Sequence, residues 1–305
     1  MAAVLSVLLS ATLGCGKESQ RGFETQGADE IAFICDSRYS LCLVGADGRG
    51  ERLITSEIQV NSFAWSPAGD RIVFATVGWW RFKDAQYIGG DDLYVMNVDG
   101  SREPLTSGAS HDRDPAWSPH GTLIAFTSDR DLERTSETAG ASGSIYVLNL
   151  EDRTLRRLTH GRHDRESAWS PDGTEIAFIR DTDVWIASAD ATNSRRLPIS
   201  RPQFPTSLAW SPDGRQIAVG DFEGGIHVVN ADGSENTRIE FDPPIVYDAD
   251  EPTWSPDGRH IAFAGASDCP AIFVAEVDGG STRRVSACEP EYDVADAPAW
   301  RPDGK

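Results

Sequence analysis

The chain has 305 residues, a formal net charge of −20 and a sequence pI of about 4.6. This charge argues against nucleic acid as a partner, because proteins bind phosphates with Lys and Arg side chains. The length fits one large all-β domain or two smaller ones. An acidic surface favours cations or basic protein surfaces as partners, although it also simply keeps a protein soluble.

The N-terminal segment predicts export. Residues 1–14 are apolar apart from a few Ser and Thr, and residues 15–29 predict a polar tether. The apolar run is too short to span a membrane and is typical of a signal peptide. Thr12-Leu13-Gly14-Cys15 resembles the lipobox of bacterial lipoproteins. The resemblance implies lipidation of Cys15 and a membrane reached through that lipid only. Plain secretion and an unmodified Cys15 within the signal are the alternatives.

One six-residue motif recurs along the rest of the chain. A full copy is Ala168-Trp169-Ser170-Pro171-Asp172-Gly173, and the strand-like run Ile176-Ala177-Phe178 follows it. The other copies contain Trp65, Trp117, Trp210, Trp254 and Trp300. Pro presets the turn and Gly accepts a positive φ, so each copy predicts a strand, a tight turn and a second strand. We expect the Trp side chains in the core and the Asp as a turn residue.

A third and a fourth strand complete each unit. Ile145-Tyr146-Val147-Leu148 is a third strand, and the polar run Arg156-Arg157-Leu158 is a fourth. Asp-Gly turns join these strands in several units, which is a strong hairpin signal. The repeat length runs from 41 residues (Trp169 to Trp210) to 52 residues (Trp117 to Trp169). Four antiparallel strands at this period predict a β-propeller blade.

The two ends of the repeat region predict how the ring closes. Residues 30–54 contain three strands but lack the leading Trp strand, and residues 298–304 supply that strand. The predicted fold is therefore an all-β, six-bladed β-propeller over residues 30–305, with four-stranded antiparallel blades. The C-terminal strand pairs with the N-terminal blade and closes the ring, which removes exposed sheet edges.

The repeat resembles that of TolB-type propellers, whose consensus runs Pro-Ala-Trp-Ser-Pro-Asp-Gly, Ile-Ala-Phe, Ile-Tyr-Val-Met-Asn, Asp-Gly-Ser and Arg-Leu-Thr. The resemblance covers roughly residues 30–305. Similar propellers occur in the periplasmic TolB protein, in prolyl-oligopeptidase relatives, in some lyases and in uncharacterised lipoproteins. TolB has an extra N-terminal α/β domain, and the short tether after Cys15 is not expected to contain one.

Four cysteines besides Cys15 are consistent with an oxidising compartment. They allow three connectivities. Cys35 and Cys42 flank a short turn, and Cys269 and Cys288 bracket a strand pair. The local pairs Cys35–Cys42 and Cys269–Cys288 are the simplest choice, and four free buried thiols are the alternative.

The irregular sequence of the blades falls on one predicted face, which we call the loop face. It holds the loops between second and third strands and the crossovers between blades, and loops on a rigid scaffold commonly carry function. Loop 76–92 contains an aromatic group, namely Trp79, Trp80, Phe82 and Tyr87. Such residues serve binding interfaces, but they equally fit a loop that folds onto its own blade.

The crossovers lead into the innermost strands, so their side chains should ring the mouth of the central channel. The predicted ligand-binding residues there are His111, Asp112, Asp114, His163, Asp164, Glu166, Asp250, Glu251 and Asp296. This acidic ring suits a basic peptide or a cation, and carboxylate oxygens suit Ca²⁺ or another divalent cation. Alternatively, the acids belong to the repeat and bridge neighbouring blades through Arg113 and Arg165. Two histidines are too few for a convincing transition-metal site.

No catalytic residue or cofactor is assigned from the sequence. The chain has no Gly-x-Ser-x-Gly elbow and no phosphate-binding glycine motif. The sequence favours a non-catalytic, monomeric, exported module, periplasmic or at the cell surface, that presents its loop face and acidic channel mouth to a protein, peptide or glycan. The alternatives are a metal-dependent hydrolase or lyase that uses channel-mouth His and Asp/Glu residues, and a scaffold in an envelope complex.

Overall fold

The computed structural model is built from β-strands. It describes residues 29–36, 39–55, 58–77, 81–83, 86–88, 90–97, 99–131, 143–161, 163–199, 204–241, 247–287 and 295–302, with only the backbone described for 81–83, 86–88 and 247–248. The predicted signal, Cys15 and most of the tether lie outside these ranges. Within them, no helix has the length and apolar character needed to cross a membrane.

Six sheets of four strands form the blades, and the strand order in each blade runs from the innermost strand outward. Blade one contains β26 (Asp296–Trp300), β1 (Glu30–Ile34), β2 (Leu41–Gly45) and β3 (Arg52–Thr55). Blade two contains β4 (Val60–Trp65), β5 (Arg71–Thr76), β8 (Leu93–Asn97) and β9 (Arg102–Pro104). Blade three contains β10 (Asp112–Trp117), β11 (Leu123–Ser128), β12 (Ser144–Asn149) and β13 (Leu155–Arg157).

The other three blades follow the same order. Blade four contains β14 (Asp164–Trp169), β15 (Glu175–Arg180), β16 (Asp183–Ser188) and β17 (Ser194–Arg196). Blade five contains β18 (Pro205–Trp210), β19 (Gln216–Asp221), β20 (Ile226–Asn230) and β21 (Asn236–Arg238). Blade six contains β22 (Tyr247–Trp254), β23 (His260–Ala266), β24 (Pro270–Glu276) and β25 (Thr282–Arg284).

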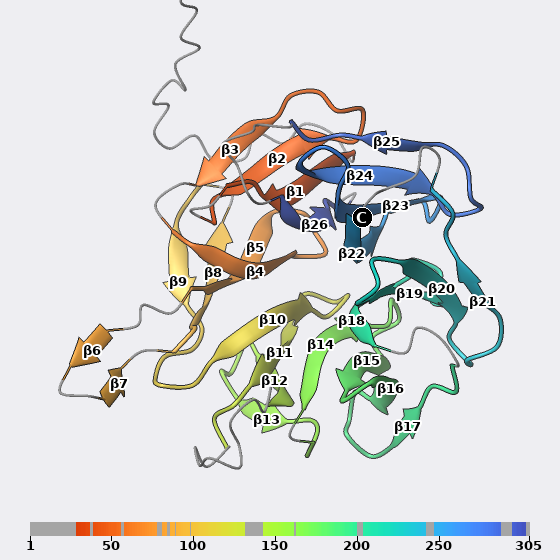
Figure 1. Cartoon of the computed structure of the whole chain (residues 1–305). Helices are drawn as coiled ribbons and strands as arrows, with labels where there is room; N and C mark the ends of the chain where they lie inside the picture. Colours follow the sequence, from red (N-terminus) through yellow and green to blue (C-terminus); the bar gives the residue numbers. More distant parts are fainter. Residues whose placement is uncertain are drawn as a thin grey trace, which may run out of the picture.

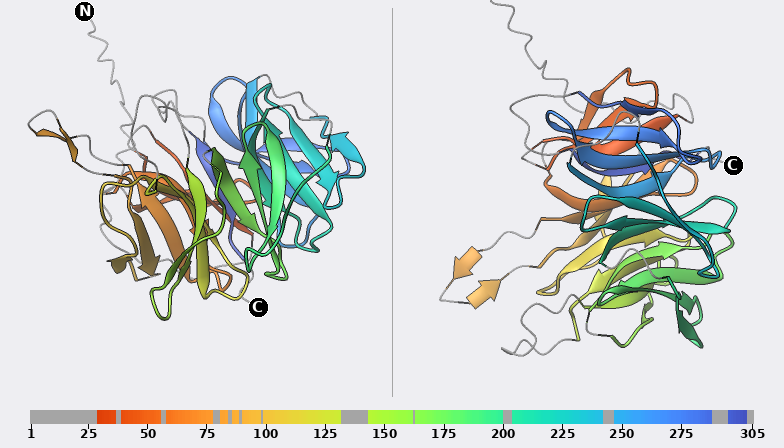
Figure 2. Two further views of the ribbon diagram at one scale, coloured as in Figure 1. Left: turned by 90° about the horizontal axis from the view of Figure 1, so that it is seen from below. Right: turned by 45° about the vertical axis from the view of Figure 1, so that its right-hand side comes forward.

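The blades stand around a central axis, with the Trp-bearing strands innermost (Figure 1). The predicted six-bladed propeller is thus confirmed. Because the strands of each blade alternate in direction, the Trp-Ser-Pro turns and the third-to-fourth-strand turns share one face, the turn face. The second-to-third-strand loops and the crossovers share the loop face. The two-stranded ribbon of β6 (Arg81–Lys83) and β7 (Gln86–Ile88) extends away from the blades on the side opposite the C-terminal end (Figure 2).

The hydrophobic core consists of six clusters, and each lies between two neighbouring blades. The second strands are apolar on both faces because each blade is packed on both sides. Five of them place a fully buried Phe at the same repeat position: Phe33, Phe74, Phe126, Phe178 and Phe263. The stability of one blade therefore depends on its two neighbours.

The recurring motif makes contacts between neighbouring blades, and in three blades the Trp indole donates to the preceding blade. Trp210 Nε1 donates to Ala168 O over 3.2 Å, and Trp254 Nε1 donates to Ala209 O over 3.1 Å. On the turn face, Gly173 has a φ of 73°, and a Cβ built there would lie 3.2 Å from Cγ of Pro119 in the previous blade. The Trp and the turn residues are therefore structural contacts between blades.

The first and last strands of the described chain pair with each other and close the ring. β26 pairs antiparallel with β1, with Trp300 opposite Ile31. In place of the turn Ser, blade one has Arg301, whose Nη1 lies 2.9 Å from Glu30 Oε2 and whose Nε donates to Gly69 O of blade two. Arg52 Nη2 lies 2.6 Å from the other oxygen of Glu30. In the other blades, a turn of the chain connects the first and second strands at the position of this buried ion pair.

One of the two predicted disulfides is present in the described residues. Cys35 and Cys42 are bonded, with their Cα atoms 5.8 Å apart. Cys269 is also disulfide-bonded. Cys288, its expected partner, lies outside the described residues, so the second pairing stays a prediction.

Candidate binding site at the channel mouth

Backbone bulges on the innermost strands shape the channel mouth. In four blades the residue three before the Trp has a left-handed backbone, with φ between 50° and 53°. These residues are Asp114, Glu166, Glu251 and Ala297. Left-handed backbone costs a residue with a Cβ of the order of 1–2 kcal/mol. Such strain persists only where the surrounding structure holds it, and it is common at functional sites.

Hydrogen bonds between adjacent blades hold these bulges. Asp114 N donates to Ser62 Oγ of blade two over 2.9 Å, and Glu251 N donates to Ser207 Oγ of blade five over 3.1 Å. Glu251 Oε2 in turn accepts a hydrogen bond from Ala297 N of blade one. Three pairs of adjacent blades are therefore linked through the residues three before their Trp.

A further acid, Asp250, lies beside Glu251 at the same mouth. Its Oδ1 accepts from Thr206 Oγ1 at 2.7 Å and from Ser207 Oγ at 2.5 Å. Burial raises its pKa, and these two hydroxyl hydrogen bonds oppose the rise. Asp250 therefore links blade six to blade five.

The channel carboxyls affect one another electrostatically. Burial raises the pKa of Glu166 well above its usual range, and the charges of Asp114 and Asp250 raise it further. Burial likewise raises the pKa of Glu251, with a hydrogen bond and the charge of Asp296 adding to the effect. Burial also raises the pKa of Asp114, although Arg113 opposes it. Acids from different blades therefore affect one another's ionisation.

His111 and Asp112, also predicted at this mouth, have partners within the fold. His111 is buried, with Nδ1 3.0 Å from Asp91 Oδ2. Asp112 is 0% exposed, and both of its oxygens accept from Arg130 Nη2, at 2.9 and 2.8 Å. Arg113 also reaches Asp91, with Nε 3.6 Å from Oδ2. These contacts link the start of β10 to blade two and to the end of β11.

Blade four repeats this arrangement. Asp164 is 0% exposed and receives Arg180 Nε at 2.6 Å and Nη2 at 2.8 Å. Arg165 Nη2 donates to Pro205 O of blade five over 3.0 Å. His163 differs from His111, because it is exposed and forms an isolated bridge with Gly143. The carboxylates of Asp112 and Asp164 are thus engaged by arginines, whereas Asp114, Glu166 and Glu251 occupy the left-handed bulges.

The structure describes little of the four aromatic residues predicted in loop 76–92. Trp79 and Trp80 lie outside them. Phe82 and Tyr87 are backbone partners in the register of β6 and β7, and only their backbones are described. In the described part of the chain, no three His, Cys, Asp or Glu side chains are grouped so as to hold a metal ion.

Sequence reasoning missed two exposed aromatic residues on the loop face of blade five. Phe204 is 55% exposed and Phe222 is 80% exposed. They are 18 residues apart in the sequence, and no repeat position marks them. Only the structure shows that they are neighbours. Phe204 immediately precedes β18, and Phe222 immediately follows β19.

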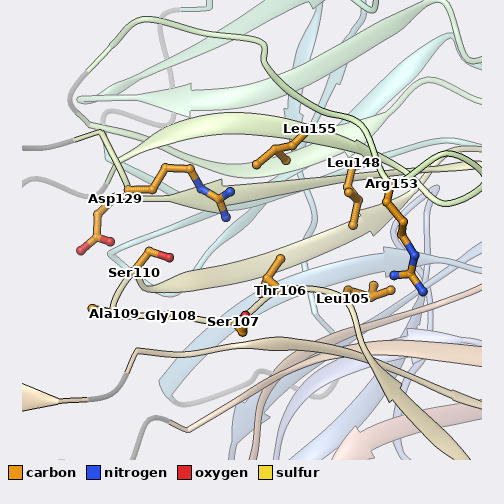
Figure 3. Close-up of a pocket in the computed structure, with 11 residues that line it drawn as sticks. Leu105, Thr106, Ser107, Gly108, Ala109, Ser110, Asp129, Leu148, Arg153 and Leu155 are labelled. Carbon is orange, nitrogen blue, oxygen red and sulfur yellow. The ribbon is translucent and has the colours of Figure 1, made fainter.

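A separate hollow lies between blades two and three, away from the predicted residues (Figure 3). Its volume is about 570 Å³. Leu148 and Leu155 line it from blade three, and Leu105 lies on the crossover side. Arg153 and Asp129 stand at opposite ends. None of the residues predicted at the channel mouth contributes to this wall.

Several solved structures have a fold similar to that of this chain. The structure of TolB from Acinetobacter baumannii superposes with a TM-score of 0.71 at 20% identity, over 91% of this chain and 68% of that protein. A putative TolB from Agrobacterium tumefaciens gives a TM-score of 0.64 at 23% identity, over 84% of this chain and 87% of that protein. The chain is a TolB-like β-propeller. At these identities the likeness to the solved structures is one of fold.

Sequence comparison of this TolB-like propeller gives shorter matches. The model of the WD domain, G-beta repeat, matches residues 201–230. The Tol-Pal system protein TolB of Anaeromyxobacter dehalogenans is 34% identical over 35% of this chain and 24% of its own length. The uncharacterized peptidase YuxL of Bacillus subtilis is 31% identical over 40% of this chain and 17% of its own length. The chain thus spans a quarter or less of these curated relatives.

Proposed function

We propose that this TolB-like propeller is a non-catalytic, exported binding module whose acidic channel mouth binds a basic segment of a partner protein. The observation that carries the proposal is the group of bulge acids, with Glu166 and Glu251 at its centre. Burial raises the pKa of both carboxyls, and the charges of neighbouring acids raise them further. A cationic ligand relieves that repulsion, because it supplies the opposite charge to a site that is preformed by the ring.

The comparisons support a protein partner more than a small substrate. The relatives from Anaeromyxobacter carry the name of the Tol-Pal system, and the solved neighbours are TolB proteins. The arginine clamps on Asp112 and Asp164 occupy the carboxylates that a hydrolytic site at this mouth would use. A rigid ring with a charged mouth is suited to recognition, since electrostatic complementarity sets specificity and association rate.

A basic peptide tests this proposal directly. We expect the peptide Lys-Lys-Gly-Lys-Lys to bind the propeller, and the double variant Glu166→Gln/Glu251→Gln to weaken binding about tenfold or more, because two carboxylate charges are lost. Binding should also strengthen from pH 5 to pH 8. The raised pKa values keep these two carboxyls protonated where ordinary carboxyls are already ionised, so their charge develops only as the pH rises. Calorimetric titration at both pH values measures the effect.

Controls separate this site from the general acidity of the chain. Glu151→Gln/Glu235→Gln removes the same charge from exposed residues of the turn face and should leave the affinity almost unchanged. The channel variant should unfold at no lower temperature than the original protein, because Gln cannot ionise in the buried site. Equal losses of affinity in the two double variants would show that binding is non-specific and would refute the channel as the site.

We also propose that Cys15 carries a lipid that anchors the propeller to a bacterial membrane. The apolar leader and the lipobox-like sequence support this. We expect Cys15→Ser to move the protein from the membrane fraction to the soluble fraction when it is expressed in its native envelope. Immunoblotting of the two fractions measures the change, and an undiminished membrane fraction would contradict lipid anchoring.

A further inference from the structure

Two phenylalanines on blade five stand exposed at neighbouring backbone positions. Phe222 N donates to Phe204 O over 3.1 Å, directly beyond the paired residues Pro205 and Asp221. Exposed fractions of 55% for Phe204 and 80% for Phe222 leave most of both side chains in water. Single exposed apolar residues are ordinary, but an adjacent aromatic pair is the kind of surface that binding interfaces use.

The turn that presents Phe222 is rigidly held. Asp221 Oδ1 accepts from Glu223 N and Gly225 N, both at 2.9 Å. Asp221 Oδ2 lies 2.8 Å from Nε2 of the buried His227 on β20. A partner that contacts Phe222 therefore loses little entropy in ordering this turn, which is the advantage of a preorganised site.

The pair is continuous with the acidic mouth. Phe204 is two residues, or about 7 Å of strand, before Thr206. Thr206 and Ser207 hold the carboxylate of Asp250. The exposed carboxylate of Glu223 follows Phe222 on the other side. Along both strands, an acid or the partner of an acid thus lies within a few residues of the aromatic pair.

We infer that Phe204 and Phe222 form the apolar anchor point for the same basic segment, and that they select segments with an aromatic residue next to Lys or Arg. This inference rests on the proposed function of the channel. The Phe faces stack on the aromatic residue of the segment and attract its cations. The channel acids take the neighbouring positive charges.

The charge of the surface distinguishes this occupant from two others. A membrane with anionic lipids is repelled by a chain of net charge −20 and by Asp250 and Glu223 beside the pair. A second copy of the chain would bring the same acids together and is disfavoured for the same reason. A basic segment with an aromatic residue does not experience this electrostatic repulsion.

Two peptides test the inference. We expect Lys-Lys-Trp-Lys-Lys to bind the propeller about tenfold more tightly than Lys-Lys-Gly-Lys-Lys, since one buried aromatic anchor is worth roughly that factor. The variant Phe204→Ser/Phe222→Ser should lose this preference and bind both peptides with the affinity that the original protein has for the glycine peptide. Leu53→Ser is the matched control, because Leu53 is also exposed but lies on β3, the outer strand of blade one. It should keep the preference.

The outcomes separate this inference from the proposed function. If the original protein binds both peptides equally, or if the Phe variant keeps its preference for Trp, the anchor is refuted while the channel site stands. If neither peptide binds, both proposals fail. Phe-dependent sedimentation with phosphatidylglycerol vesicles, or a Phe-dependent dimer in analytical ultracentrifugation, would assign the pair to a membrane or to a second copy and would overturn the inference.

Discussion

A chain that lacks residues 296–302 is expected not to form a stable ring. The deletion removes β26, and with it the buried Trp300 and the ion pair of Arg301 with Glu30. Loss of a buried Trp side chain alone costs about 3–5 kcal/mol, and breaking a buried ion pair costs a similar amount. The total approaches the roughly 5–15 kcal/mol that holds a typical domain folded. Circular dichroism during urea titration should show an early, broad transition in place of a cooperative one.

Two shorter changes show which contact matters. Removal of residues 303–305 retains β26 and should leave the urea midpoint within experimental error. Arg301→Ala retains the strand but leaves Glu30 with only the half-exposed Arg52, and we expect a loss of about 3 kcal/mol or more. A deletion of residues 296–302 that unfolds as cooperatively as the intact chain would show that β26 is not needed to close the ring.

Asp164→Asn should be among the most destabilising single substitutions in the ring. The substitution keeps the shape of the side chain but removes the charge that two Arg180 nitrogens contact at 2.6 and 2.8 Å. Arg180 also lies over Trp185, 4.9 Å from the ring centroid, so the guanidinium is fixed at this place. A buried charge that loses its partner costs about 3–5 kcal/mol. The free energy of unfolding from urea titration measures the loss.

Blade four supplies the matched control for Asp164→Asn. Asp183 and Arg196 also form an ion pair, at 2.7 Å, but their side chains are 35% and 55% exposed. Asp183→Asn should therefore cost only about 0.2–1 kcal/mol. The double variant Asp164→Asn/Arg180→Met should recover part of the loss, because it removes the unpaired charge. Equal costs for the two Asn variants would mean that burial does not govern these pairs.

The fold is predictable from this sequence because the same residues recur at fixed offsets. Pro-Asp-Gly sets each turn, and the Ile-Ala-Phe run has the apolar character of a strand packed on both sides. The truncated copy at Trp300 also fixes ring closure. The role of Arg301 could not be predicted, since only the structure shows that Glu30 lies across the gap left by a missing turn.

The channel site is predictable only in part. Counting back from each Trp places Asp114, Glu166 and Glu251 at the mouth, because the repeat makes these positions equivalent. The sequence does not show the left-handed bulge that separates these residues from Asp112 and Asp164. Neighbouring acids therefore look alike in the sequence, whereas in the structure some occupy left-handed bulges and others are paired with arginines. Phe204 and Phe222 carry no repeat signal at all.

The β6–β7 ribbon shows where a blade accommodates a long insertion between two paired strands. Residues 77–92 separate β5 from β8, yet the two strands pair without a register shift, from Arg71 opposite Asn97 to Ala75 opposite Leu93. The corresponding junction in blade four is two residues long, between Arg180 and Asp183. The junction in blade two thus contains a hairpin, although the strand pairing of the blade is regular. The same junction in other blades is a natural graft point for new recognition segments, so specificity can diversify without any change to the ring.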